Sequence, residues 1–369
     1  KGVLKYAGFN HIRCYIIHIN SKYVRHGTID IKELFAVREV TAKVNKSLES
    51  VMKLVDNINK VAEIDNEPVC EIGIHCMTPH KCAYWKHCTE ILPEPSVFDI
   101  AGISLMKKFE MYHDGIVSYE DVERSGCATE RQLMQVKSEL YDMKPFINKN
   151  EIRKFIDELS YPMYFLDFET YQNAVPEYDG VTPFYQIPFQ YSLHIVDSDD
   201  TEPVHKEFLA EYGDDPRRKL AMQLVSDIPK DVCVIAYNMV FEKTVIKRLA
   251  ELFPDIAEQL MNIYSNIHDL MIPFQKFHYY NKNMHGSYSL KSVVPAMFPD
   301  DEQINYDNLQ QIHHGGEAMA AYCSMKNKSK QEQEIIKNNL LKYCNLDTLS
   351  LVRILEKLKQ YCDYQYGQG

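Results

Sequence analysis

The sequence lacks the features that mark membrane and secreted proteins. No apolar run approaches the roughly 20 residues that a membrane-spanning helix needs. No basic-then-apolar signal peptide opens the chain, and low-complexity tracts and internal repeats are absent. These absences predict a folded cytoplasmic protein without a membrane partner. Its 369 residues leave room for two or three domains.

The sequence also lacks an excess of positive charge. The formal net charge is −11, with 22 basic and 23 acidic residues up to position 160 and 19 basic and 29 acidic residues after it. A protein that binds nucleic acid normally presents a basic face. If the second half of the chain handles a polyanion, it therefore needs bound cations or a local basic patch. The residues available for such a patch are Arg217, Arg218, Lys243, Lys247 and Arg248, which equally suit solvated helix faces.

Cysteines are unevenly distributed: four of the ten lie at equal six-residue intervals. These four are Cys70, Cys76, Cys82 and Cys88. Thiolates bind zinc and iron–sulfur clusters tightly, and such crowding without a secretion signal favours a metal site over disulfides. The spacing is not the CxxC of a zinc knuckle, so zinc and a cluster both remain open, as do unpaired buried cysteines. The histidines that could replace a cysteine ligand are His75, His80 and His87.

The most informative stretch is residues 161–171, an apolar run that ends in two acids. Its composition predicts a strand buried on both faces of a sheet. Asp167 and Glu169 are two residues apart, so their side chains point to the same face of that strand. Two adjacent carboxylates repel each other unless a shared proton or a divalent metal neutralises them. The alternative is an edge strand with two solvated acids.

The order of patterns along the chain predicts an α/β fold. The first part carries a strand at residues 15–19 and an amphipathic helix at 41–64. The expected divisions are 1–91, 92–160 as a helical connector, and 161–369. After residue 161 we expect further strands over 189–196, 204–209 and 232–237, and helices over 215–225, 241–252 and 331–361, the last interrupted near Asn345. Strands followed by alternating helices indicate a mixed sheet flanked by helices.

Two further acids occur in positions that suit a shared site. Glu242 follows the expected strand at 232–237, and Asp347 lies on the last helix. Tyr343 precedes Asp347 by four residues, so the two share one helix face. Four carboxylates from distant segments could hold two divalent ions, which stabilise the attacking and leaving oxygens of phosphodiester hydrolysis. Tyr343 could orient the attacking water.

Three motifs in this order resemble the DEDD superfamily of 3′–5′ exonucleases. They are Asp167-x-Glu169, Asn238-x-x-Phe241-Glu242 and Tyr343-x-x-x-Asp347, and the tyrosine is typical of the DEDDy branch. The resemblance covers about residues 155–360 and implies an RNase H-like fold. It also implies two Mg²⁺ or Mn²⁺ ions and release of nucleotides from single-stranded 3′ ends of DNA or RNA. Glu242 stands where the family usually has Asp, so its longer arm puts one metal in doubt.

The resemblance also implies roles for individual residues. Asp167, Glu169, Glu242 and Asp347 would hold metal, and Tyr343 would join them in catalysis. Asn238 would fix the loop that presents Glu242. The residues expected to contact the substrate are Phe168, Thr170, Phe184, Tyr185, Asn238 and Lys291. The aromatic ones would flank the terminal base, although core packing is an equal expectation for Phe168.

Residues 1–91 resemble the end of a RecB-like nuclease related to CRISPR-associated nucleases. In a bacterial family with that arrangement, a domain similar to residues 161–369 follows the nuclease. The resemblance implies that Cys76, Cys82 and Cys88, with Cys70 or an upstream cysteine, hold a 4Fe–4S cluster, with Zn²⁺ as the alternative. The chain opens at Lys1-Gly2 without Met, so we expect the missing nuclease half upstream in a longer protein.

Two other functions fit the same residues. One is a nucleic-acid-binding module of a nuclease assembly that is weakly active or inactive because of Glu242. The other is a metal-dependent enzyme that acts on a small nucleotide. Binding without cleavage would distinguish the first, and a preference for a mononucleotide ester over an oligonucleotide would distinguish the second.

Overall fold

The computed structural model describes residues 1–309 and 311–363, which form two compact units. The first unit comprises Lys1–Thr89 and Gln172–Tyr185, and the second comprises Glu90–Tyr171 and Gln186–Gly369. The whole segment predicted as a connector, residues 92–160, therefore lies within the second unit. No helix in the described part of the chain is both long and apolar enough to cross a bilayer.

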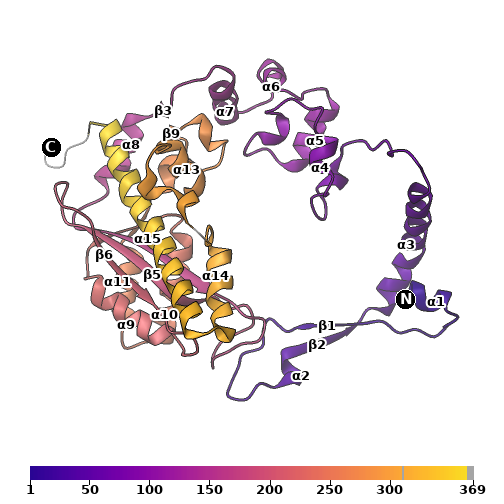
Figure 1. The fold of residues 1–369 in the computed structure, drawn as a ribbon, viewed down its shortest axis with the longest axis horizontal. Helices are drawn as coiled ribbons and strands as arrows, with labels where there is room; N and C mark the ends of the chain where they lie inside the picture. The colour runs from indigo at the N-terminus through magenta and orange to yellow at the C-terminus, as the bar shows by residue number, and fades with distance from the viewer. Residues whose placement is uncertain (310, 364–369) are drawn as a thin grey trace. The chain divides into compact units, whose positions relative to one another are not determined.

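The first unit is built from short elements and one long helix (Figure 1). Its elements are α1 (Gly2–Tyr6), β1 (Tyr15–Ile19), α2 (Ile31–Leu34), β2 (Phe35–Glu39), α3 (Thr41–Ala62), η1 (Ile74–Cys76) and α4 (Trp85–Cys88). Strands β1 and β2 pair antiparallel, and the predicted strand at 15–19 and helix at 41–64 are both present. None of the 22 residues of α3 is buried, so its apolar stripe is covered only in part.

The second unit begins with a group of short helices. Its elements are η2 (Val97–Asp99), α5 (Leu105–His113), α6 (Tyr119–Ser125), α7 (Glu130–Leu140), β3 (Phe146–Ile147) and α8 (Lys149–Asp157). Ser118 and Thr129 begin α6 and α7 with capping boxes, as their sequence spacing predicts. Their apolar faces form a small core around Val97, Val122 and Val136.

A five-stranded mixed sheet forms the centre of the second unit (Figure 1). Its strands are β4 (Met163–Tyr171), β5 (Ile187–Val196), β6 (Val204–Leu209), β7 (Cys233–Ala236) and β8 (Ile267–Asp269), in the spatial order β6-β5-β4-β7-β8. Strands β4, β5 and β6 pair antiparallel, whereas β7 and β8 run parallel to β4. The sequence predicted the first four strands, but three-residue β8 was missed.

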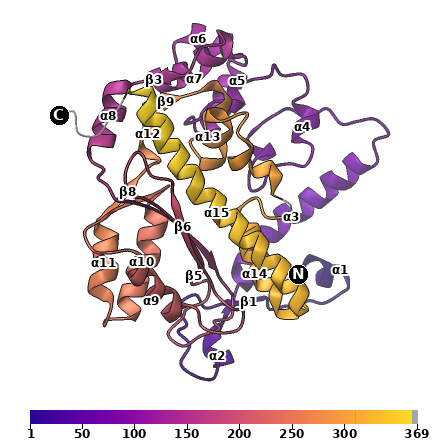
Figure 2. The same cartoon turned by 60° about the vertical axis from the view of Figure 1, so that its left-hand side comes forward.

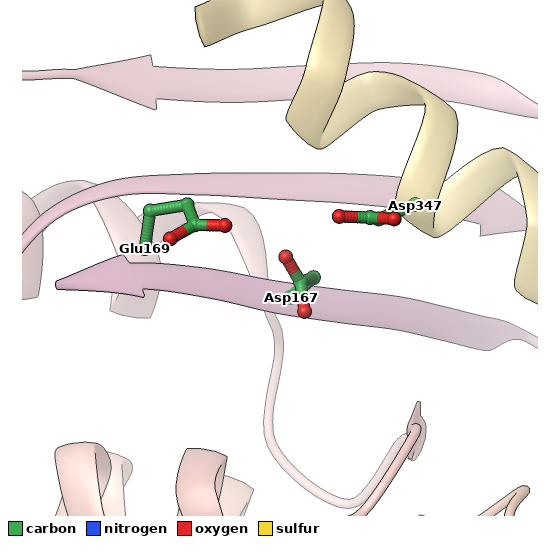
Figure 3. A group of neighbouring side chains, drawn as sticks. All are labelled: Asp167, Glu169 and Asp347. Atoms are coloured by element: carbon green, nitrogen blue, oxygen red, sulfur yellow. The ribbon is translucent and has the colours of Figure 1, made fainter. Parts of the chain in front are cut away.

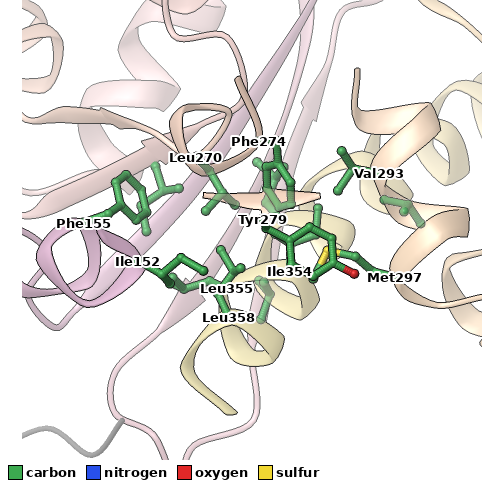
Figure 4. Packing of buried hydrophobic residues seen from close by; sticks show 14 of the residues in the cluster. Ile152, Phe155, Leu270, Phe274, Tyr279, Val293, Met297, Ile354, Leu355 and Leu358 are labelled. Carbon is green, nitrogen blue, oxygen red and sulfur yellow. The ribbon is translucent and has the colours of Figure 1, made fainter. Parts of the chain in front are cut away.

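Helices cover both faces of this sheet (Figure 2). The remaining elements are α9 (Arg217–Asp227), α10 (Val240–Leu252), α11 (Ala257–Ser265), α12 (Ile272–Gln275), β9 (Tyr279–Tyr280), η3 (Lys282–Met284), α13 (Leu290–Met297), η4 (Glu302–Ile304), η5 (Tyr306–Asn308), α14 (Gly315–Ser324), η6 (Met325–Asn327) and α15 (Lys330–Tyr361). Helices α9, α10 and α11 pack against Leu166 and Val234 on one face. Helices α8, α12, α13 and α15 pack against Phe165 and Ile235 on the other, around the core shown in Figure 4.

The last helix differs from the prediction. Residues Lys330–Tyr361 form one continuous helix of 32 residues, so the predicted interruption near Asn345 is wrong. A capping box of Ser329 with Glu332 begins it. Asn disfavours a helix by less than ~1 kcal/mol, whereas each large apolar side chain buried nearby contributes about 1.5–3 kcal/mol. Packing of α15 against the sheet therefore outweighs the local preference of Asn345.

Candidate metal centre

Strand β4 places two acids on the face of the sheet that α15 covers. Phe165 belongs to the core on the α15 side, and side chains two residues apart along a strand share a face. Asp167 and Glu169 therefore follow Phe165 on that side, and the bulge in β4 comes only after Glu169. Leu166 and Phe168 point to the opposite core.

Helix α15 brings a third acid to the same place (Figure 3). Asp167, Glu169 and Asp347 each offer a carboxylate oxygen, and the three oxygens lie within 4.8 Å of one another. Glu169 and Asp347 are buried and Asp167 is half-buried. Hard divalent ions such as Mg²⁺ and Mn²⁺ prefer oxygen ligands of this kind. The arrangement suits a metal cation.

Burial and mutual repulsion disfavour the charged forms of these acids. Burial raises the pKa of Asp167 well above its usual range, and the charge of Asp347 raises it further. The pKa of Glu169 is raised by burial and then by Asp167 and Asp347. Burial raises the pKa of Asp347 to about 6. A bound cation would reverse this effect, because an adjacent positive charge favours ionised carboxylates.

Two tyrosines and a lysine surround Asp347. The hydroxyl of Tyr306 in η5 donates a hydrogen bond of 2.5 Å to Oδ1 of Asp347. Lys291 Nζ donates to the hydroxyl oxygen of Tyr343 at 3.1 Å and to the carbonyl of His313. The charge of Lys291 also acts on all three carboxylates, which it stabilises in the ionised form. Lys291, expected to contact substrate, thus lies beside the acids.

Hydrogen bonds between α15 and β5 fix the position of Asp347. Thr348, next along the helix, lies 2.7 Å from the hydroxyl of Ser192 and 2.8 Å from Nδ1 of His194. Almost two helical turns before Asp347, the carbonyl of Leu340 accepts a hydrogen bond of 2.9 Å from Gln190 Nε2. Ser192 is also the residue that pairs with Asp167 across the sheet. These hydrogen bonds fix α15 against the sheet and so keep Asp347 close to Asp167 and Glu169 on β4.

Gly315, the first residue of helix α14 (Gly315–Ser324), lies close to the carboxylate of Glu169. A Cβ atom at Gly315 would lie 3.3 Å from Glu169 Oε2. Any larger residue there would crowd the carboxylate, so the glycine permits this close approach. No local sequence pattern marks Gly315, because its role depends on a contact with Glu169, a residue far away along the chain.

Glu242 lies close to the three acids but outside their group. It is buried in the first turn of α10, with 2% of its surface exposed. Its Oε2 atom has no hydrogen-bond partner among the described residues. Burial raises the pKa of Glu242 well above its usual range, and Asp167 is the largest electrostatic contributor. An unpartnered carboxylate oxygen beside three other acids is an unusual arrangement unless a cation or a proton accompanies it.

A second buried acid holds the loop that leads to Glu242. Asp269 at the end of β8 accepts hydrogen bonds from the backbone N–H groups of Asn238 at 2.9 Å and Met271 at 3.0 Å. Asn238 has a positive φ of 64°, a conformation that Asn tolerates better than most residues. The expected role of Asn238 in shaping this loop therefore depends on its backbone.

The residues expected to stack on a base are placed differently. Phe168 is buried in the core opposite the acids, where it packs against Tyr191 with ring centroids 6.2 Å apart. It therefore does not face the carboxylates. Phe184, which is exposed, and half-buried Tyr185 belong to the first unit. Thr170 is half-buried and directly follows the bulge in β4.

The four clustered cysteines lie in the first unit. Cys70 and Cys82 are exposed, whereas Cys76 and Cys88 are half-buried, and all four are unpaired thiols. The pKa of the Cys88 thiol is raised by burial and then by Cys76, Cys82 and Cys70, so the four are electrostatic neighbours. Among the described residues, the acids alone form a group of three potential ligands as tight as 4.8 Å.

Comparison with known proteins finds one family model that matches part of the chain. Residues 164–289 match a family described as a domain of unknown function (DUF2779). The match includes Asp167, Glu169 and Glu242, and ends before Lys291 and α15. Neither a curated protein nor a solved structure matches the chain.

Proposed function

We propose that the second unit is an RNase H-like 3′–5′ exonuclease that hydrolyses phosphodiester bonds with two divalent ions, Mg²⁺ or Mn²⁺. The observation that carries the proposal is the convergence of Asp167, Glu169 and Asp347. They come from a strand and a helix 178 residues later in the chain. The unpartnered Oε2 atom of Glu242 beside them supports a second ion. The sequence resemblance to DEDD exonucleases supplies the reaction.

Each residue has a role that follows from its position. Asp167, Glu169 and Asp347 would hold metal, and Glu242 would contribute from its place next to Asp167. When bound, two divalent ions stabilise the charge on the attacking and leaving oxygens of a phosphodiester. Burial and the charge of Asp347 raise the pKa of Tyr343, so its hydroxyl stays protonated at neutral pH. Tyr343 therefore acts as a hydrogen-bond donor that orients water or phosphate, and not as a base.

A nuclease assay on 5′-labelled single strands tests the proposal. With Mn²⁺ we expect stepwise shortening from the 3′ end, and none with a chelator. Asp167→Asn should lower the rate at least ~10³-fold, because several kcal/mol of transition-state stabilisation depend on the metals. The exposed acid Asp300 provides the matched control, since Asp300→Asn leaves the site intact. Equal rates for the Asp167→Asn and Asp300→Asn variants would disprove the proposal.

A binding module that does not cleave is the second candidate. The observation that favours it is the position of Glu242, which is not among the three acids able to share one ion. A site with one well-held metal could bind a strand end without hydrolysing it. Binding of an oligonucleotide with no shortening in Mn²⁺ would favour this function.

The clustered cysteines support a separate proposal for the first unit. We infer that Cys76, Cys82 and Cys88, with Cys70, hold a 4Fe–4S cluster or Zn²⁺. The support is their electrostatic proximity and the affinity of thiolates for these groups. Metal analysis of protein purified without oxygen, together with visible absorption, distinguishes iron from zinc. Unchanged metal content in a Cys82→Ser variant would contradict the proposal.

A further inference from the structure

A neutral side chain on β5 carries a buried oxygen that has no hydrogen-bond partner among the described residues. The atom is Oε1 of Gln190, a residue with no exposed surface. Most buried polar atoms in folded proteins have a partner, because an unpaired one costs free energy. An unpaired oxygen in such a place therefore indicates that water or a ligand meets it.

The register of the sheet places Gln190 directly opposite Glu169. The two residues pair across the antiparallel strands β4 and β5, and Asp167 pairs with Ser192 two positions further along. Directly opposite side chains lie on the same face of a sheet, with Cβ atoms about 4.5–5.5 Å apart. Gln190 is therefore a neighbour of the group of three acids, at its Glu169 end.

Contacts with α15 show which face of the sheet Gln190 occupies. Its Nε2 group donates a hydrogen bond of 2.9 Å to the carbonyl of Leu340 on α15. Ser192 follows Gln190 by two residues, and its hydroxyl lies 2.7 Å from that of Thr348 on the same helix. The intervening residue, Tyr191, belongs to the core on the opposite face. The side chain of Gln190 thus lies on the face that carries the acids.

The hydrogen bond to α15 also fixes the orientation of the Gln190 amide. A backbone carbonyl only accepts hydrogen bonds, so the nitrogen must be the end that meets Leu340. The oxygen then occupies the other end, and exchange of the two ends would place two acceptors against each other. Since Oε1 can only accept, its missing partner is a hydrogen-bond donor or a cation.

Glu169 does not supply this donor when it is ionised. A carboxylate only accepts hydrogen bonds, so Gln190 and Glu169 are two acceptors at neighbouring positions. Buried acceptors of this kind need a donor or a positive charge beside them. A hydrated divalent ion supplies both, because it binds carboxylate oxygens and keeps water molecules that donate hydrogen bonds.

We propose that Gln190 is a positioning residue of the metal centre, and that its Oε1 atom accepts a hydrogen bond from water in the hydration shell of the cation beside Glu169. This role rests on the metal centre of the proposed function and extends that centre to β5. A neutral amide suits the position, because another carboxylate would add to the repulsion among the acids. The hydrogen bond to Leu340 holds the oxygen in place before the cation binds.

Calorimetric titration of the full chain with Mn²⁺ measures this role without a substrate. Gln190→Met keeps the length of the side chain and removes both hydrogen-bonding ends. The dissociation constant for Mn²⁺ should rise ~10-fold or more, the usual effect of removing an outer partner of a metal ligand. Gln190→Glu keeps an acceptor and loses the donor to Leu340. Its carboxylate ionises beside the cation, so Mn²⁺ should bind at least as tightly as to the wild-type chain.

The two substitutions separate positioning of the cation from anchoring of α15. If Gln190 acted only through Leu340, both variants would weaken Mn²⁺ binding to a similar degree. Gln135 provides the matched control, because it is a buried glutamine whose amide is paired at both ends. Its Oε1 accepts from the Ala101 N–H at 2.9 Å, and its Nε2 donates to the Asp99 carbonyl at 3.0 Å. Gln135→Met should leave the Mn²⁺ affinity unchanged.

Two results would overturn the inference. One is an unchanged Mn²⁺ affinity in folded Gln190→Met, and the other is a weakening in Gln190→Glu as large as in Gln190→Met. If Gln190→Met fails to fold, as judged by circular dichroism, the direction of the change in Gln190→Glu decides alone, and weaker binding overturns the role. A Gln190→Glu chain that is unfolded both in a chelator and in Mn²⁺ would overturn it as well.

The nuclease assay separates this inference from the proposed function. Wild-type Mn²⁺ affinity and normal shortening of strands by Gln190→Met would overturn the role of Gln190 and leave the exonuclease intact. Loss of Mn²⁺ affinity in Gln190→Met and its retention in Gln190→Glu, in a protein that hydrolyses no strand, would keep the role and overturn the exonuclease.

Discussion

Both units contain strands and helices with regularly spaced apolar residues, but these residues are largely buried only in the second unit. In the first unit, large apolar side chains of the β1–β2 hairpin and of α3 are exposed, including Ile17, Val37 and Ile58 at 62–66%. Among its described residues, the buried apolar side chains other than proline are Tyr23, Leu34, Ile72 and Val181. In the second unit, all ten residues of β5 are buried, and helices cover both faces of the sheet. An amphipathic pattern therefore specifies a helix or a strand, whereas stable packing also requires an apolar surface elsewhere in the protein to cover it.

The largest expected effect concerns independent folding. A chain that begins at Glu90 should keep a cooperative unfolding transition, because it retains the sheet and both cores. Residues 1–89 alone, without metal, should show no cooperative transition, since few of their apolar side chains are buried. Urea denaturation followed by circular dichroism measures both. A sharp transition in the metal-free 1–89 fragment would show that its elements pack more completely than the exposed side chains indicate.

Matched truncations in the two units should differ strongly. Ile354 on α15 is fully buried, so Ile354→Ala should lower the free energy of unfolding by about 2–5 kcal/mol. Ile58 on α3 is 64% exposed, so Ile58→Ala should change it by less than about 0.5 kcal/mol. The comparison is made on the urea transition of the full chain. Similar losses for both variants would break the contrast between a packed and an unpacked helix.

Buried acids should make the second unit sensitive to pH. In the metal-free protein the pKa of Asp347 rises from 3.8 to about 6, so the folded state holds the proton more tightly than the unfolded state. This contribution, at most about 3 kcal/mol, is present below pH ~4 and is lost as the pH rises through about 6. Thermal unfolding in a chelator measures it.

Mn²⁺ should reverse this pH trend, because the ion binds the ionised carboxylates. The variant Asp347→Asn should flatten the chelator curve, and Asp300→Asn, at an exposed position, should leave it unchanged. A metal-free protein whose stability does not depend on pH between 4 and 7 would contradict the raised pKa values.

Local patterns predicted much of the site, and long-range contacts supplied the rest. The two-residue spacing of Asp167 and Glu169 fixes their common face, and the four-residue spacing of Tyr343 and Asp347 does the same on the helix. The same alternation places Phe168 on the opposite face, a signal that was available from the sequence. Tyr306 has no such signal, because its partner Asp347 lies 41 residues away and the connecting segments follow no period.

The continuity of α15 and the exposure of α3 depend on a different kind of information. Both helices carry apolar positions at helical spacing, yet α15 lies against the sheet with many buried residues and α3 has none that is buried. The spacing of apolar residues defines the apolar face of a helix, but the surface that covers this face comes from elsewhere in the chain. For the same reason the sequence indicated the three acids but not Ser192, His194 and Thr348, which lock α15 onto β5.

The smallest expected effect tests what burial adds to one hydrogen bond. Tyr306 donates to buried Asp347 at 2.5 Å, and Tyr141 donates to Glu123 at 2.7 Å from an exposed position. Tyr306→Phe removes the donor that holds the Asp347 carboxylate in place. A hydrogen bond to a charged group is worth about 1.5–3 kcal/mol, so the Mn²⁺ concentration for half-maximal binding should rise ~10-fold or more.

The matched variant Tyr141→Phe should leave metal binding unchanged, because Tyr141 is exposed and its partner Glu123 is far from the acids along the chain. Calorimetric titration with Mn²⁺ measures both variants without a substrate. If Tyr306→Phe lowered the unfolding temperature but left Mn²⁺ affinity intact, Tyr306 would serve the fold alone. A weaker affinity at unchanged unfolding temperature would show that burial converts an ordinary tyrosine–carboxylate hydrogen bond into a positioning device for the metal centre.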